Sequence, residues 1–296
     1  MAEIYCCDKA SILNHAKKLG YINHYRPELT DKDRQDIIDK YYTYKAKDLA
    51  NIYHCSESLI IKIWHAANIV NKKSRRVYTL NENIFNEINT PEKAYFLGLL
   101  SADGCVSINK HKQNTLKLSL QYKDIEIIKK FQQFLHTDKP IRIFEQHRDN
   151  FIGKYADIEI SSDMIVNDLT KYNLFQNHTY SFRFCIFDEP FMSHYVRGYF
   201  DGDGSIYFTT RDNRCVCSLV GYYDNLVIVQ NYLQTKGITL HWVRDNRQYN
   251  GGEFGQLRTN NRKECYNLIR YLYYDDNDLC LQRKKEKANI FLSTYN

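Results

Sequence analysis

The chain has 296 residues, of which 43% are hydrophobic and 26% are charged. This composition is typical of folded domains and excludes a largely disordered chain, and the length allows two or three domains of ordinary size. A net charge of +6 permits a polyanionic partner such as nucleic acid without requiring one. No apolar run is long enough to span a membrane, and the N-terminus does not have the pattern of a signal or transit peptide.

The nine cysteines show no spacing typical of a metal site or a disulfide framework. Cys6 and Cys7 are adjacent, and no CxxC pair exists. Cys215 and Cys217 alternate as residues of a strand do. We therefore predict buried, reduced thiols rather than a zinc site. These features predict a soluble, intracellular protein, cytoplasmic in a bacterial, phage or viral host, with an organelle as an alternative.

Residues 1–80 are predicted to form a small helical domain followed by a basic linker. A helical pattern covers 31–42, and the next segment indicates a short helix, a tight turn at His54–Cys55 and a helix capped by Ser56. This layout resembles a helix-turn-helix, whose second helix enters the major groove of DNA. A three-helix bundle that binds no nucleic acid is the alternative.

The two faces of this helical domain differ in character. The apolar residues of the predicted inner face are Leu49, Ala50, Ile60, Ile63 and Trp64. The residues of the domain and its linker that we expect to contact DNA are Ser58, Lys62, Arg75 and Arg76.

From residue 81 the chain repeats itself at an offset of 100 residues. YFLGLLSADGCVSI, which begins at Tyr95, corresponds to YVRGYFDGDGSIYF, which begins at Tyr195. The identical pairs are Tyr95/Tyr195, Gly98/Gly198, Asp103/Asp203, Gly104/Gly204, Tyr122/Tyr222 and Asp124/Asp224. Chance would give roughly two identities in such a window. Two tandem copies of one unit are therefore predicted, over 81–187 and 188–296.

Each copy is predicted to be a mixed α+β unit with the order αββαββα. Its first helix begins near a proline, Pro91 or Pro190, and ends at the glycine of the ADG or GDG turn. A strand covers 116–121, where apolar and polar residues alternate. The remaining predicted elements are helices over 124–135 and 224–234 and strands over 141–144, 156–160, 238–245 and 254–259.

Small residues recur four apart near the end of each first helix. They are Gly98 and Ala102 in the first copy and Gly198 and Gly202 in the second. Residues four apart share one helix face, so the two helices could pack closely there. Asp103 and Asp203 would then lie side by side. Because each repels the other and faces the negative end of its helix dipole, a divalent cation such as Mg²⁺ would stabilise the pair and activate water for phosphodiester hydrolysis. The alternative is that each Asp-Gly merely shapes a turn.

The segments FLGLLSADG (96–104) and VRGYFDGDG (196–204) resemble the two motifs of LAGLIDADG homing endonucleases of the monomeric, two-repeat kind. The resemblance covers 81–296 and implies two pseudo-symmetric αββαββα halves, with the motif helices at their interface and a saddle of strands in the DNA major groove. It implies metal-dependent double-strand cleavage at a long recognition site. Asp103 and Asp203 would hold the metal, with Gly104 and Gly204 beside them.

The resemblance also implies a basic residue near the scissile phosphate in each half. Lys284 fits this place in the second half, whereas His178 stands in place of the usual lysine in the first. Ser101 replaces the first acid of motif one, and Asp201 keeps it in motif two. These departures predict unequal cleavage rates on the two DNA strands.

The polar faces of the predicted strands are the expected DNA surface, because Arg and Gln can read base edges while Lys mostly contacts phosphate. The candidates are Lys117, Ser119, Gln121, Arg142, Arg211, His241, Arg244, Gln256 and Arg258. A solvated sheet face is the alternative. Two other functions are compatible with the sequence, namely a DNA-binding regulator without cleavage and a maturase that binds intron RNA. An intein is not expected, because no splice-junction residue opens the chain.

Overall fold

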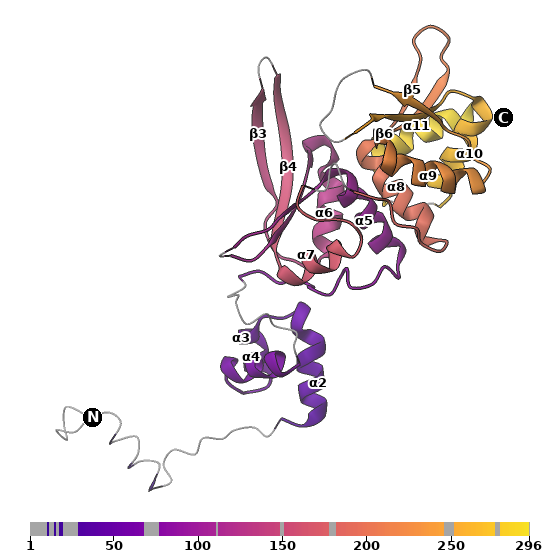
Figure 1. Ribbon diagram of the computed structural model, residues 1–296. Coiled ribbons are helices and arrows are strands. Elements are labelled where there is room, and N and C mark those ends of the chain that lie inside the picture. Colours follow the sequence, from indigo (N-terminus) through magenta and orange to yellow (C-terminus); the bar gives the residue numbers. More distant parts are fainter. Residues whose placement is uncertain are drawn as a thin grey trace. The chain divides into compact units, whose positions relative to one another are not determined.

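A computed structural model describes residues 29–67, 77–110, 112–148, 151–177, 182–245, 252–275 and 279–295, and the single positions 11, 15, 18 and 19. The chain divides into two compact units, Met1–Lys72 and Lys73–Asn296 (Figure 1). In the described part of the chain, no helix is both long and apolar enough to cross a membrane.

The N-terminal unit contains a bundle of short helices. They are α2 (Asp31–Asp39), the 3-10 helix η1 (Lys40–Tyr42), α3 (Ala46–Ile52) and α4 (Glu57–Ala66). The Ser56 side chain accepts a hydrogen bond from the Leu59 N–H and so caps α4, as predicted. The Trp64 indole N–H donates to the buried Ile37 carbonyl at 2.9 Å and ties α4 to α2. The five residues predicted for the inner face are all buried.

The second unit contains two halves with the predicted order αββαββα. The first half comprises α5 (Pro91–Asp103), β1 (Gly104–Ser107), β2 (Thr115–Gln121), the 3-10 helix η2 (Tyr122–Asp124), α6 (Ile125–Phe134), β3 (Arg142–Arg148), β4 (Phe151–Ser161) and α7 (Asp163–Thr170). The second half comprises α8 (Phe191–Asp203), β5 (Gly204–Phe208), β6 (Cys215–Tyr222), α9 (Tyr223–Thr235), β7 (His241–Arg244), β8 (Phe254–Thr259) and α10 (Arg262–Leu272). A further helix, α11 (Gln282–Ser293), follows the second half.

Each half has one antiparallel sheet, and the two sheets have equivalent strand orders, β1-β2-β4-β3 and β5-β6-β8-β7. In β2, Leu116, Leu118 and Leu120 are buried in the core while the intervening residues face outward. This alternation places one face of the sheet against the helices and leaves the other open. The two halves share one hydrophobic core, in which α5 packs along α8 (Figure 1).

Candidate catalytic site

The motif helices α5 and α8 cross at two glycines. A Cβ added to Gly98 would lie 2.0 Å from the Tyr195 carbonyl oxygen, and one added to Gly198 would lie 2.0 Å from the Tyr95 carbonyl oxygen. No side chain tolerates such a distance, so only glycine permits this approach of the backbones. Because the four residues match at an offset of 100, the crossing is pseudo-symmetric.

The same helix faces bring the ends of α5 and α8 together. A Cβ added to Gly202 would lie 2.3 Å from the Ala102 Cβ and 2.8 Å from Asp103 Oδ2. The Asp103 carboxylate therefore lies against the end of α8, of which Asp203 is the last residue. Small residues at these positions thus place both carboxylates at one end of the helix pair.

Both carboxyl groups have raised pKa values. Burial raises the pKa of Asp103 to about 6, against the lowering effect of Lys284 and Arg283. Burial, followed by the negative charge of Asp103, raises the pKa of Asp203 to about 7, against the lowering effect of Lys284. The two carboxylates therefore remain short of positive charge despite the cations beside them, which is an environment that a bound cation would relieve.

Lys284 is buried, and its ammonium group caps the end of α8. Its Nζ donates hydrogen bonds to the carbonyl oxygens of Phe200, Asp201 and Gly204, each at 2.6 Å. An ammonium has three donors, so this arrangement leaves none for a phosphate. The positive charge instead offsets the negative end of the α8 dipole. Burial lowers the pKa of Lys284 to about 8. The structure thus places Lys284 beside the carboxylates but with partners other than the expected phosphate.

Asp201 is fully buried and ties three segments together. Its carboxylate accepts hydrogen bonds from the Tyr95 hydroxyl at 2.8 Å, the Tyr273 hydroxyl at 2.9 Å and the Leu281 N–H at 2.7 Å. The first acid of motif two therefore anchors the chain just before α11, where Lys284 lies. Its counterpart Ser101 donates a hydrogen bond to the Leu97 carbonyl, one turn back in α5.

Two ion pairs cross between the halves in a pseudo-symmetric way. Arg283 Nε lies 3.1 Å from both carboxylate oxygens of Asp124, and Arg183 Nη2 lies 3.0 Å from Asp224 Oδ2. Both the arginines and the aspartates are 100 residues apart in the sequence. This pair of arginines was not predicted from the sequence, although its two members lie at the same 100-residue offset that revealed the repeat.

The 100-residue offset of these ion pairs points to a second candidate for the counterpart of Lys284. The residue 100 positions before Lys284 is Phe184, which is buried and packs on Tyr195 and Tyr199. The match of His178 to Lys284 rested on local sequence and stays a prediction, whereas the offset of the ion pairs favours Phe184 as the counterpart of Lys284. His178 itself lies outside the described residues.

A cavity of about 270 Å³ lies beside Asp203. Its lining includes Ser101, Ala102, Gly104, Tyr199, Asp203 and Asn225. At the 100-residue offset, Ser101, Ala102 and Gly104 correspond to Asp201, Gly202 and Gly204. The carbonyl oxygens of the latter three surround the Lys284 ammonium. The end of α5 therefore has a cavity where the end of α8 has a cation. The buried Asn225 Oδ1 has no hydrogen-bond partner, so the cavity carries a polar acceptor beside the carboxylate.

The predicted contact residues of β2 lie on the open face of the first sheet. Lys117, Ser119 and Gln121 alternate with the buried leucines. Arg142 of β3 is directly opposite the buried Asp157, to which its guanidinium donates two hydrogen bonds. This face therefore includes a buried acid, Asp157, which was not predicted from the sequence.

The second sheet also has an open face with predicted contact residues. The register pairs His241 with Arg258 and Val243 with Gln256, so His241, Gln256 and Arg258 share this face.

Two arginines predicted for the same face lie elsewhere. Arg244 pairs with Gly255 and so lies on the face opposite to His241, where it forms an ion pair with Glu253 at 3.2 Å. The prediction placed both β7 residues on one face, but they are three apart in a strand whose faces alternate with period two. Arg211 lies in the turn between β5 and β6 rather than on a strand.

In the N-terminal unit, Ser58 and Lys62 are exposed on α4, the second helix of the predicted helix-turn-helix. Arg75 and Arg76 lie outside the described residues.

A family model confirms the resemblance of the first half. Residues 90–162 match the LAGLIDADG-like domain. The match lies within the first half, and the second half repeats the strand order of the first. No match was found among curated proteins.

Several solved structures have a similar fold. The meganuclease I-SmaMI bound to uncleaveable DNA is 12% identical with a TM-score of 0.47, over 70% of this chain and 92% of that one. The homing endonuclease I-WcaI bound to its DNA recognition sequence is 13% identical with a TM-score of 0.48, over 74% and 94%. The N-terminal LAGLIDADG domain of DUF199/WhiA is 15% identical with a TM-score of 0.42, over 74% and 100%. At these identities, the likeness is one of fold alone.

Proposed function

We propose that this chain is a site-specific DNA endonuclease of the homing type, which makes a metal-dependent double-strand break at a long recognition site. The observation that carries the proposal is the pair of carboxylates, Asp103 and Asp203, at the adjoining ends of two closely packed helices. Burial raises the pKa of both carboxyl groups, and the negative charge of Asp103 raises that of Asp203 further, so a bound cation would stabilise the ionised pair.

The residues at the helix ends fit a hard divalent cation such as Mg²⁺. Asp103 and Asp203 offer carboxylate oxygens, and the adjoining Gly104 and Gly204 offer backbone carbonyls, which are the ligands this ion prefers. When bound, the cation would supply an activated water and stabilise the leaving oxygen of the phosphodiester. Lys284 would position Asp203 by holding the end of α8, and Asn225 would orient solvent in the adjoining cavity.

The proposed partner is double-stranded DNA, bound by a monomer whose two halves are related by an internal pseudo-twofold axis. The open faces of the two sheets would contact the major groove through Lys117, Ser119, Gln121, Arg142, His241, Gln256 and Arg258. We propose residues 81–187 and 188–296 as the two repeats. Residues 1–80 would then form a separate DNA-binding domain that lengthens the recognition site, with Ser58 and Lys62 on its recognition helix.

Selection from a randomised DNA library with Mg²⁺ tests this proposal. The full chain should yield cleaved sequences that share one long site. Asp103→Asn and Asp203→Asn should each slow cleavage roughly a hundredfold or more while leaving DNA affinity nearly intact, because they remove metal ligands and not the binding surface. Glu87→Gln, which alters an exposed acid before α5, is the matched control and should cleave normally.

Three outcomes would contradict the nuclease proposal. Selective DNA binding without cleavage would identify a DNA-binding regulator. Tight binding of intron RNA in preference to DNA would identify a maturase. Cleavage that persists when both acids are replaced would mean that the carboxylate pair is not the catalytic centre.

A further inference from the structure

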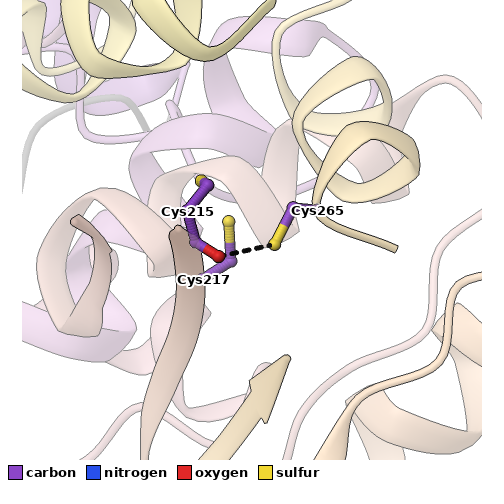
Figure 2. A group of neighbouring side chains, drawn as sticks. All are labelled: Cys215, Cys217 and Cys265. Carbon is purple, nitrogen blue, oxygen red and sulfur yellow. Dashed lines mark hydrogen bonds between the residues drawn. The ribbon is translucent and has the colours of Figure 1, made fainter. Parts of the chain in front are cut away.

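Three cysteine side chains meet in the core of the second half (Figure 2). Cys215 and Cys217 are two residues apart on β6, so both leave the strand on the same face. Cys265 extends toward them from the N-terminal end of α10. All three are buried, and their sulfur atoms lie within 4.8 Å of one another. Within the described residues, no other group of three potential metal ligands is this compact.

We propose that these three thiols bind one thiophilic cation of the Zn²⁺ class, which links β6 to α10. Sulfur is the donor that such ions select, whereas Mg²⁺ selects oxygen. The site is therefore distinct from the carboxylate pair in its chemistry as well as its place in the fold, and it does not depend on the proposed nuclease function.

The arrangement of the sulfurs suits such an ion. With Zn–S bonds of about 2.3 Å, three thiolates around one ion lie about 4 Å apart. The observed spread of up to 4.8 Å is closed by sulfur movements of less than about 1 Å, which small changes in side-chain torsion provide. Both elements are held in the core of the second half, so the three donors are already oriented toward one point.

The place of Cys265 in the first turn of α10 favours the thiolate that metal ligation requires. Cys265 is the fourth residue of α10, so its sulfur lies near the positive end of the helix dipole. In the thiol form, Cys265 Sγ donates to the carbonyl oxygens of Cys215 and Thr259 at 3.6 and 3.7 Å. A divalent cation would therefore displace the protons of all three thiols when it binds.

A cavity gives an ion access to the cluster. It measures about 440 Å³ and is lined in part by Cys215, Arg214, Arg262 and Phe208. It opens beside Cys215, and it offers room for a solvent molecule as the fourth ligand of a tetrahedral ion.

The sequence predicted buried, reduced thiols because no metal-binding spacing was visible. Cys265 lies 48 residues beyond Cys217, and only the packing of α10 on β6 brings the two together. Packed thiols without an ion are the competing interpretation, and a disulfide between two of the three is another.

Titration of the full chain with Cd²⁺ tests the proposal, because thiolate-to-cadmium charge transfer gives an ultraviolet band that oxygen ligands do not. The chain is kept reduced with a phosphine that does not chelate metals. We expect the band to saturate at one equivalent. Cys265→Ser and Cys215→Ser should each weaken binding at least tenfold. Cys105→Ser, at an exposed position of β1, and Cys280→Ser, at a buried position outside the cluster, should titrate like the wild type.

Thermal denaturation gives a second readout that separates the two metal sites. Zn²⁺ should raise the Tm of the wild type and of the Asp103→Asn, Asp203→Asn double variant, but not that of Cys265→Ser. If Cys265→Ser does not fold, the cadmium affinity of Cys215→Ser and the cadmium stoichiometry of the wild type test the proposal instead. The absence of a saturable cadmium band in the folded wild type would overturn the proposal, as would an undiminished band in Cys215→Ser.

Discussion

At the scale of single residues, the two carboxylates give the protein a characteristic pH dependence. The pKa values of Asp103 and Asp203, about 6 and about 7 in the folded chain, exceed the ordinary value of 3.8. The folded chain therefore binds more protons than the unfolded chain between about pH 4 and pH 7, so the free energy of unfolding falls as pH rises through this interval. We predict that, in a chelator, the Tm declines from about pH 5 to about pH 8.

Two comparisons isolate the carboxylates as the cause of this decline. Asp103→Asn combined with Asp203→Asn should flatten it, because the amides do not titrate. Mg²⁺ binds the deprotonated pair, so it should raise the Tm of the wild type more at about pH 8 than at about pH 6. A decline of the same slope in the double variant would assign the effect to other groups.

Lys284 acts on the same carboxylates from the end of α8. Lys284→Met keeps the aliphatic chain but removes the ammonium donor from three carbonyls, of which only that of Phe200 is known to keep another donor, the Gly204 N–H. This loss should cost about 1–3 kcal/mol of stability. Loss of the cation also removes a charge that lowers both carboxyl pKa values. We predict that the pH at which Mg²⁺ begins to raise the Tm shifts upward, as measured by denaturation scans across pH. A purely structural lysine would change the Tm and leave this pH midpoint in place.

At the scale of elements, the helix crossing depends on two glycines. Gly98→Ala places a methyl group where the Tyr195 carbonyl now lies, so α5 and α8 must separate. We predict a loss of about 3 kcal/mol or more in urea denaturation, at the upper end of overpacking effects. Gly198→Ala should cost about the same, because its contact is the pseudo-symmetric one.

Gly237→Ala is the matched control for these substitutions. Gly237 has a φ of +72° and open space around it, so an alanine there meets only backbone strain of about 1 kcal/mol. If all three variants lost equal stability, backbone conformation rather than helix approach would explain the glycines.

The elements that local periodicity could specify were predictable from the sequence. The αββαββα order and the motif helices follow from alternation, caps and duplication, and the burial of the α4 face follows from helical spacing. The position of Arg244 was missed because strand register depends on pairing with β8. The cap that Lys284 makes on α8 and the cavity at the end of α5 were also missed, because both depend on contacts between distant segments. The 100-residue offset between Arg183 and Arg283 was a sequence signal for these contacts between distant segments.

At the scale of the whole molecule, the two halves are alike in backbone but unequal in charge. The end of α8 has the Lys284 ammonium, whereas the end of α5 has a cavity, and Phe184 occupies the position that corresponds to Lys284. In a nuclease, each half would serve one scissile phosphate. Because only one half has the buried cation, the two DNA strands should be cleaved at different rates.

We predict that supercoiled plasmid carrying one target site passes through a nicked form, with the two strand rates differing by about tenfold or more, as a difference of about 1.4 kcal/mol in activation free energy would give. Lys284→Phe makes the halves alike, so the rate ratio should fall toward one as the faster step slows. Lys287→Met, which removes an exposed cation one turn along α11, is the control and should preserve the nicked intermediate. Direct conversion of the supercoiled plasmid to linear DNA by the wild type would show that the charge difference between the halves does not affect the strand-cleavage rates.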